Sequence, residues 1–129
     1  MVQKCKGPQK FDGNNVVGWI EIKDPQVVGM TWYRLQTDEF DMAMDKPRNL
    51  IWYIGVEGSV PSGSCDVQTV WQYEFGHGLG LNHSAVYGSL MESYYEGARR
   101  ALSPDDINGI STLYSSSAPV SGSTVVAIS

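Results

Sequence analysis

The first half of the chain has the hydrophobic pattern of β-strands. β-branched and aromatic residues fill residues 16–22 and 30–35, and in residues 40–45 Phe and Met alternate with Asp and Ala. This alternation indicates a strand with one solvated face. A fourth apolar run covers residues 50–54, and turn signals such as Asp24-Pro25 separate the runs. The pattern therefore predicts four strands between residues 16 and 54.

The period becomes helical further along the chain. Ser64 or Asp66 can cap a helix in which apolar residues recur at helical spacing from Val67 to Leu79. Gly78 and Gly80 are suited to its end, because glycine tolerates the left-handed conformation in which helices often terminate. We therefore expect a helix over residues 67–79.

A second helix start lies near the end of the chain. Ser103 supplies the cap and Pro104 takes the first helical position, where its missing N–H costs nothing. Asp105 and Asp106 then face the positive end of the helix dipole. Beyond this helix the sequence is rich in serine. We expect one domain over residues 1–114 and a tail or linker over residues 115–129.

Composition narrows the classes of protein. The chain has 129 residues, of which 42% are hydrophobic and 18% are charged, as in globular proteins. No apolar run approaches the roughly 18 residues of a membrane span. A net charge of −5 without a basic cluster argues against nucleic acid as a partner. Residues 1–10 lack the apolar stretch of a signal peptide. The chain is therefore either cytoplasmic or a trimmed secreted domain with an added Met1, and we favour the second.

The chemistry lies in residues 73–83, which read YEFGHGLGLNH. Tyr73 and His77 are four positions apart and share one helix face, with Glu74 beside them. Gly80 lets the chain turn back, so that His83 can approach the same point. A catalytic zinc ion takes three protein ligands and leaves one position open for water. Glu74 would act on that water as a general base.

This segment resembles the metzincin signature H-E-x-x-H-x-x-G-x-x-H. Residues 74–84 match the form typical of matrixins, H-E-F-G-H-x-L-G-L-x-H-S, at every fixed position. Met91 falls where matrixins place the methionine of the Met-turn beneath the metal. Residues 102–114 are similar to the C-terminal helix of matrixins, which also ends in a Leu-Tyr pair.

The resemblance implies a fold and an activity. The expected fold is the α+β fold of metzincins: a twisted mixed sheet of four or five strands, an active-site helix, a Met-turn and a C-terminal helix. A substrate cleft would lie between the helix and an edge strand at residues 50–54. The implied activity is zinc-dependent hydrolysis of peptide bonds in extended polypeptides, with Glu74 activating a zinc-bound water.

The resemblance also implies site residues and a location. The metal ligands would be Tyr73, His77 and His83, holding one catalytic zinc ion. The sequence has only two histidines, so no structural zinc is expected. The substrate pocket would include Thr69, Tyr94 and Tyr95. A secreted monomer is expected.

Tyr73 departs from the family pattern, which has histidine at this position. In one interpretation the Tyr73 phenolate ligates zinc, which leaves the ion a weaker Lewis acid and moves the pH optimum upward. In a second, the metal is lost or weakly held, and the domain binds peptides without cleaving them. In a third, zinc is held by His77, His83 and either Glu92 or water. A purely structural domain is a further class, in which no metal binds.

The two cysteines, Cys5 and Cys65, leave three interpretations open. We expect a disulfide, which would suit a secreted domain and close a loop of about 60 residues, a length that stabilises by roughly 4 kcal/mol. They could instead be two free thiols. Cys5 could also reach the metal as an internal inhibitor.

Overall fold

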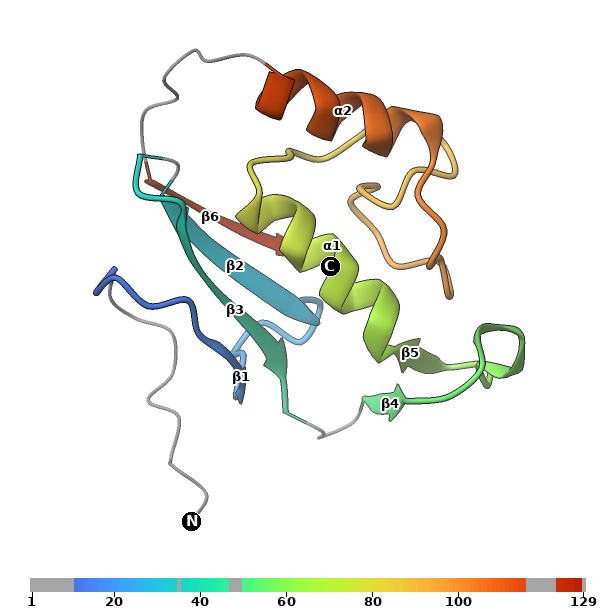
Figure 1. The fold of residues 1–129 in the computed structure, drawn as a ribbon. Helices are drawn as coiled ribbons and strands as arrows, with labels where there is room; N and C mark the ends of the chain where they lie inside the picture. Colours follow the sequence, from blue (N-terminus) through green and yellow to red (C-terminus); the bar gives the residue numbers. More distant parts are fainter. Residues whose placement is uncertain (1–10, 35, 47–49, 116–122, 129) are drawn as a thin grey trace.

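The computed structural model describes residues 11–34, 36–46, 50–115 and 123–128 (Figure 1). Its larger sheet has the strand order β1-β3-β2-β6. β1 runs parallel to β3, whereas β2 is antiparallel to both β3 and β6, so the sheet is mixed. The strands are β1 (Val17–Ile20), β2 (Gly29–Arg34), β3 (Glu39–Asp45) and β6 (Ser123–Ile128).

A single helix lies across one face of this sheet. Helix α1 (Val67–Gly78) packs on β2 and β3, and α2 (Pro104–Ser115) lies beyond it on the side away from the sheet (Figure 1). A small parallel sheet joins β4 (Ile51–Tyr53) to β5 (Ser64–Asp66), with the short 3-10 helix Glu57–Ser59 between them. The arrangement is α+β, as predicted.

Two strands differ from their predicted places. β4 was expected in the main sheet, but it pairs with β5 instead. Both sides of β3 are already occupied, by β1 and β2, so the chain that follows β3 has no place beside it. The fourth strand of the main sheet is β6, from the segment predicted to be a tail. The run Thr124-Val125-Val126 within it has high β-propensity, which explains why it pairs with β2.

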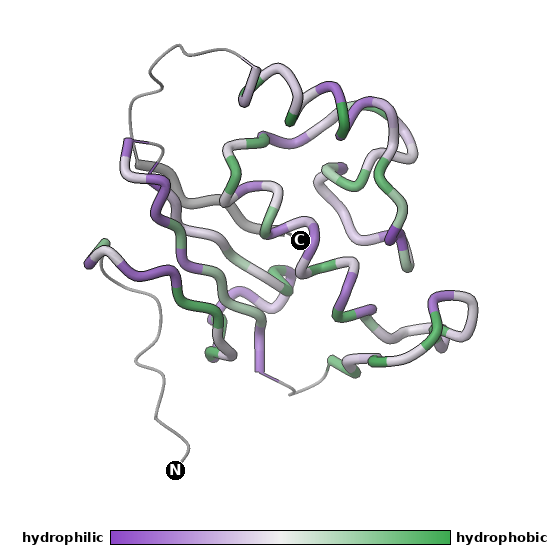
Figure 2. The backbone as a smooth tube through the Cα atoms, viewed as in Figure 1, coloured by the Kyte–Doolittle hydropathy of each residue, from purple (hydrophilic) through white to green (hydrophobic). Residues whose placement is uncertain are grey.

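The prediction of a solvated face on β3 was wrong. Hydrophobic and hydrophilic residues do alternate along β3 (Figure 2), but every residue of the strand is buried. Asp41 accepts a hydrogen bond from the Val16 N–H (2.8 Å), and Asp45 accepts one from the Ile22 N–H (2.7 Å). Burial raises the pKa of Asp41 even though the Val16 N–H stabilises its charged form. The acidic face of β3 therefore fastens the segment that contains β1.

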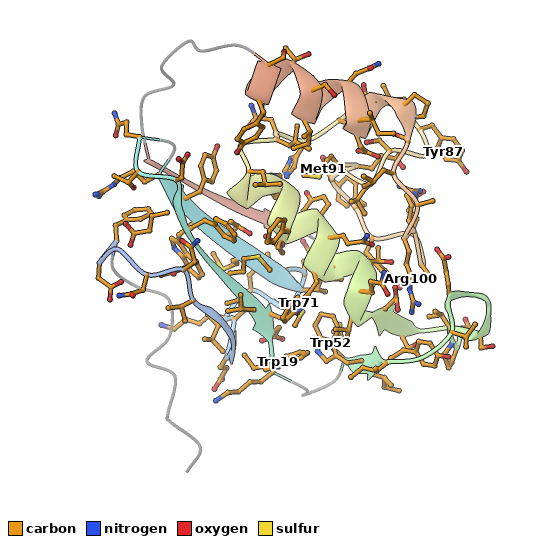
Figure 3. All side chains as sticks on the ribbon, in the orientation of Figure 1. Trp19, Trp52, Trp71, Tyr87, Met91 and Arg100 are labelled. Carbon is orange, nitrogen blue, oxygen red and sulfur yellow. The ribbon has the colours of Figure 1, made fainter. Side chains whose placement is uncertain are left out.

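The main core lies between α1 and the sheet. Its buried members come from both layers and from the loop after α1, namely Val28, Met44, Cys65, Val70, Tyr73, Leu90 and Met91. At the lower end of the molecule, Trp19 of β1 and Trp52 of β4 meet edge to face, with ring centroids 5.2 Å apart (Figure 3). This contact joins the two sheets.

Candidate metal centre

Helix α1 ends in a turn that brings the chain back toward its own buried face. The Gly80 N–H donates to the His77 carbonyl, and the Leu81 N–H donates to the Gly76 carbonyl, each at 2.9 Å. These two bonds form a Schellman motif, and Gly80 has the positive φ, +100°, that the motif requires. The reversal places His83 near the last turn of α1, as the sequence predicted.

Three aromatic rings converge beside this turn. The ring centroids of Tyr73 and His77 lie 4.6 Å apart, and those of His77 and His83 lie 5.1 Å apart. Tyr73 and His83 complete the triangle at 6.0 Å. Tyr73 and His77 are fully buried on α1, whereas His83 is exposed. The three predicted metal ligands are therefore brought together from two segments.

His77 is held in the form that binds metals. Its Nδ1 lies 2.6 Å from the Leu81 carbonyl oxygen, which can only accept, so Nδ1 carries the hydrogen and donates. The lone pair then lies on Nε2, which is buried and has no hydrogen-bond partner. The pKa of His77 is lowered to about 4. Burial is the main cause and nearby His83 adds to it, while the Leu81 hydrogen bond opposes both. A neutral imidazole whose second nitrogen bonds a carbonyl is the usual metal-binding arrangement.

The Tyr73 hydroxyl is the second buried polar atom without a partner. Its Oη accepts and donates no hydrogen bond. Burial, with a smaller effect of Glu74, raises the pKa of Tyr73. Unpartnered buried polar atoms are rare and costly, and a bound cation would satisfy Tyr73 Oη and His77 Nε2 together. No three His, Cys, Asp or Glu side chains gather in the described part of the chain. A zinc ion held by three side chains here would therefore need the phenol of Tyr73 beside the two histidines, whereas with His77 and His83 alone water would have to complete the site.

Glu74 faces β2 rather than solvent. The Thr31 hydroxyl donates to Glu74 Oε2 at 2.5 Å and also lies 2.9 Å from the Glu74 carbonyl. The other oxygen, Oε1, is buried without a partner. A Cβ on Gly29 would come within 2.6 Å of Oε1, so only glycine leaves room for the carboxylate. Burial raises the pKa of Glu74 to about 8, although the Thr31 bond opposes this.

The predicted Met-turn lies under α1. A Cβ on Gly76 would meet the Met91 sulfur at 2.6 Å, which shows how closely the two segments pack. The Ser84 N–H, one residue after His83, donates to the Met91 carbonyl (2.8 Å). Asp106 of α2 accepts hydrogen bonds from the Ser89 hydroxyl (2.6 Å) and from N–H groups of the turn. The sequence indicated Asp106 only as a helix-start acid, and its hold on the Met-turn was missed.

Comparison with known proteins agrees with this geometry. A family model described as Matrixin matches residues 3–115. The chain belongs to the matrixin family. Karilysin of Tannerella forsythia is 39% identical over 50% of this chain and 14% of its own length. Matrix metalloproteinase-19 of Homo sapiens is 42% identical over 43% of this chain and 11% of its own length. The hatching enzyme of Paracentrotus lividus is 52% identical over 34% of this chain and 8% of its own length. The chain thus spans a small part of these relatives.

The N-terminus of α1 in this matrixin is fixed by an ion pair that sequence analysis missed. The buried Asp66 carboxylate caps the helix and accepts two hydrogen bonds from the Arg100 guanidinium, at 2.6 and 2.9 Å. These bonds lower the pKa of Asp66 despite its burial. The Tyr95 hydroxyl accepts the Asp66 N–H (2.8 Å). Asp66 and Arg100 are 34 residues apart in the chain, and only the fold brings them together.

The three residues predicted for a substrate pocket do meet. Thr69, Tyr94 and Tyr95 line one small cavity of about 10 Å³, together with Tyr73. The Thr69 hydroxyl donates to Asp66 (2.7 Å), and Tyr94 is 69% exposed. The cavity therefore adjoins Tyr73 of the ring cluster, and its role as a substrate pocket stays a prediction.

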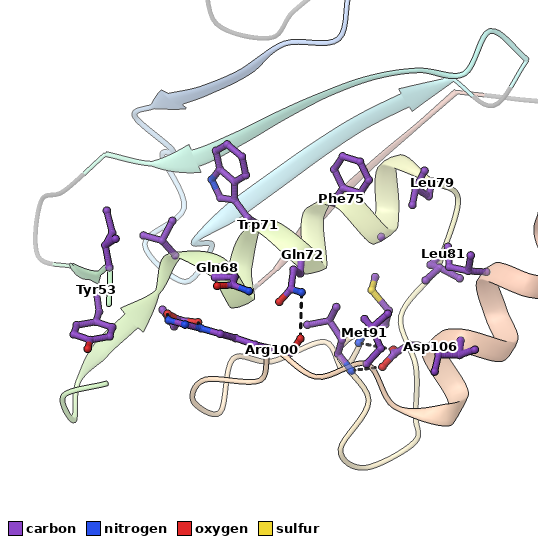
Figure 4. Close-up of a pocket in the computed structure, with 18 of the residues that line it drawn as sticks. Tyr53, Gln68, Trp71, Gln72, Phe75, Leu79, Leu81, Met91, Arg100 and Asp106 are labelled. Carbon is purple, nitrogen blue, oxygen red and sulfur yellow. Dashed lines mark hydrogen bonds and ion pairs between the residues drawn. The ribbon is translucent and has the colours of Figure 1, made fainter. Parts of the chain in front are cut away.

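A larger groove of about 750 Å³ lies on the other face of α1 (Figure 4). Trp71 and Phe75 line it from α1 and Met91 lines it from the Met-turn, and the paired Asp66 and Arg100 are among its other lining residues. Its lining is mostly apolar, and Trp71 and Phe75 remain 41% and 47% exposed. The ring cluster of this matrixin lies on the opposite, buried side of the helix.

The disulfide remains a prediction, because Cys5 lies outside the described residues. Cys65 is buried and forms no disulfide with any residue that the structure describes. Burial raises the pKa of the Cys65 thiol, so it is a poor nucleophile at neutral pH.

Proposed function

We propose that this chain is the catalytic domain of a zinc-dependent endopeptidase that hydrolyses extended polypeptides. The observation that supports this most is the pair of buried, unpartnered atoms, Tyr73 Oη and His77 Nε2, next to the His83 ring. Leaving these two buried atoms without partners costs free energy, and a cation bound to both would remove this cost. Membership of the matrixin family supports the same class of enzyme.

In this proposal each residue has one task. His77, His83 and Tyr73 hold the ion, and zinc there would polarise the scissile carbonyl. The Thr31 hydroxyl fixes one oxygen of Glu74 and leaves Oε1 free. Oε1 would take a proton from water as the water oxygen adds to the scissile carbonyl, and would pass this proton to the leaving amine as the C–N bond breaks. Glu74 packs closely against Gly29 and is not exposed, so the one water on which it acts would be the water held by the ion and not bulk water.

Cleavage of a denatured protein tests the proposal. The purified domain should contain about one zinc ion per chain and should cleave casein or gelatin until a chelator is added. Glu74→Gln should abolish cleavage but keep the zinc, because it removes the base and not a ligand. Glu21→Gln, at an exposed position just after β1 and away from the ring cluster, is the matched control and should remain active. Cleavage that survives in Glu74→Gln would overturn the proposal.

A second candidate is a peptide-binding module without turnover. The substitution of Tyr73 for the histidine of the family pattern favours it, because a ligand must be deprotonated to bind a metal and a buried phenol resists deprotonation. The two candidates differ in the behaviour of Tyr73→His. The binding module is correct if the parent holds no zinc and cleaves nothing, while Tyr73→His binds zinc and cleaves the substrate.

We also propose that the domain acts outside the cell and as a monomer. The relatives include one named an interstitial collagenase, from Equus caballus, 51% identical over 33% of this chain. Fractionation of the source cells tests the location, and light scattering of the purified domain tests the monomer. Retention in the cytoplasm or a dimer mass would contradict the respective proposal.

A further inference from the structure

Arg99 ties the loop after the Met-turn to two other parts of the site. Its Nη1 donates to the Ser89 carbonyl (2.6 Å) and pairs with the Glu92 carboxylate. Its backbone N–H donates to the Thr69 hydroxyl on α1 (2.8 Å). Glu92 Oε2 accepts a further bond from the Gly88 N–H (3.1 Å). The Arg99 and Glu92 side chains are only 23% and 20% exposed, so the pair is shielded from water.

Both partners of this pair line the small cavity beside Tyr73. Its volume of about 10 Å³ is roughly the space of a single water molecule. The loop reverses at Gly97, whose φ of +120° suits glycine, and Arg99 then returns the chain to α1. A space of this size is too small for a leucine side chain.

We propose that the Arg99–Glu92 pair is a latch that restricts the cavity to small substrate side chains next to the scissile bond. This inference rests on the proposed function, because it assigns Arg99 as a specificity-determining residue of that reaction. Removing one member of a shielded pair leaves the other charge unpaired, so the loop should move away from α1. The cavity then joins the space that the Arg99 side chain vacates.

Hydrogen-exchange mass spectrometry tests the latch without any cleavage. Amide exchange over residues 93–99 should be at least about 10-fold faster in Arg99→Ala and Glu92→Gln than in the parent, as in loops that open locally. Glu96→Gln is the control, because Glu96 lies 4.0 Å from Arg99 and is 58% exposed. Unchanged exchange in Arg99→Ala would overturn the latch, whether or not the protein is a peptidase.

A peptide series tests the specificity. Each of the two positions flanking the scissile bond is varied through Gly, Ala, Leu and Phe. The parent should favour Gly and Ala at one position by at least about 10-fold, and Arg99→Ala should lose this preference while Arg99→Lys keeps part of it. The same peptides, labelled with fluorescein, are titrated by anisotropy against zinc-loaded Glu74→Gln protein.

The outcomes separate the two proposals. Size-selective binding without cleavage would overturn the endopeptidase and support the latch. Cleavage with the same size preference in the parent and in Arg99→Ala would support the endopeptidase and overturn the latch. Absence of any size preference in the parent, in cleavage and in binding, would overturn the latch as well.

Discussion

At the scale of single residues, the site is defined by polar atoms that have nothing to bind. Tyr73 Oη, His77 Nε2 and Glu74 Oε1 are all buried without hydrogen-bond partners. Each such atom lowers the stability of the metal-free protein by roughly 1–3 kcal/mol. A stable fold tolerates this cost where function requires it. The residues that look worst placed in the metal-free state are therefore those most suited to a cation.

Tyr73→Phe should separate stability from metal binding. Removing the unpartnered hydroxyl should stabilise the metal-free domain by about 1 kcal/mol, measured by urea unfolding with chelator present. The same change should lower zinc affinity by at least about 10-fold, measured by competition with a zinc indicator. Tyr87→Phe, at an 85% exposed position, should alter neither quantity. Unchanged zinc affinity in Tyr73→Phe would remove the phenol from the ligand set.

Gly29→Ala should disturb Glu74 through packing alone. The added methyl group would lie 2.6 Å from Glu74 Oε1, so the carboxylate or β2 must shift. We expect a loss of about 1–3 kcal/mol in the free energy of unfolding, measured with urea, and reduced peptide cleavage. The control is Gly58→Ala, because a Cβ there meets nothing within 4 Å. Equal stability of the two variants would show that the pocket around Glu74 is looser than described.

At the scale of elements, α2 helps to hold the Met-turn in place, in addition to hydrogen bonds within the turn itself. Asp106, in the first turn of α2, receives donors from Ser89, Leu90 and Ser103. The Met-turn in turn accepts the N–H of Ser84, next to His83. The position of His83, a proposed metal ligand, is thus linked through two short contacts to the start of a helix about 20 residues further along the chain.

Asp106→Asn should destabilise the domain in a pH-dependent way. Burial tends to raise the pKa of Asp106, but the hydrogen bonds from Ser89, Leu90 and Ser103 outweigh it, and the folded-state pKa is lowered. A lowered carboxyl pKa gives stability above the unfolded-state pKa of about 3.9, and this stability is lost as pH falls through the folded-state value.

The measurement for Asp106 is urea unfolding of parent and variant at several pH values. At pH 7 the parent should be more stable by about 2 kcal/mol, and the difference should shrink below pH 4. Asp24→Asn, an exposed position where asparagine can accept the same turn hydrogen bond, should cost little at any pH. A difference that stays constant down to pH 2 would contradict the charged state of Asp106.

Local patterns predicted the elements well and their partners less well. The four apolar runs became strands, and Ser103 and Gly80 marked a helix start and a helix end where expected. Pairing between distant strands leaves little local signal, so the place of β4 was wrong. The convergence of Tyr73, His77 and His83 could be predicted from their spacing along one helix and the turn that follows it. The Asp66–Arg100 pair and the Thr31 bond to Glu74 could not, because they join residues that are distant in the chain.

At the scale of the whole molecule, the sheet is completed by the last described strand. β6 pairs with β2 along its full length, although their residues are about 90 positions apart. β2 carries both Gly29 and Thr31, the neighbours of Glu74. The pairing of β6 with β2 therefore supports the strand that positions Glu74, the proposed base.

Deleting residues 116–129 should weaken the domain without removing the ring cluster. The unpaired edge of β2 loses its cross-strand contacts, so we expect at least about 1 kcal/mol less stability and a tendency to aggregate. Urea unfolding and light scattering measure the two effects. Extending the chain instead with a flexible Gly-Ser segment after residue 129 should have no effect. A deletion variant as stable as the parent would show that the segment is a tail, as the sequence suggested.

The unequal exposure of the three rings has a consequence for how an ion arrives and departs. Tyr73 and His77 lie on the buried face of α1, whereas His83 is exposed on a loop. We expect loading to begin at His83 and to finish when its imidazole swings inward with the captured ion. Small multidentate chelators would then strip the ion by displacing this one side chain first, at a rate governed by loop motion and not by global unfolding.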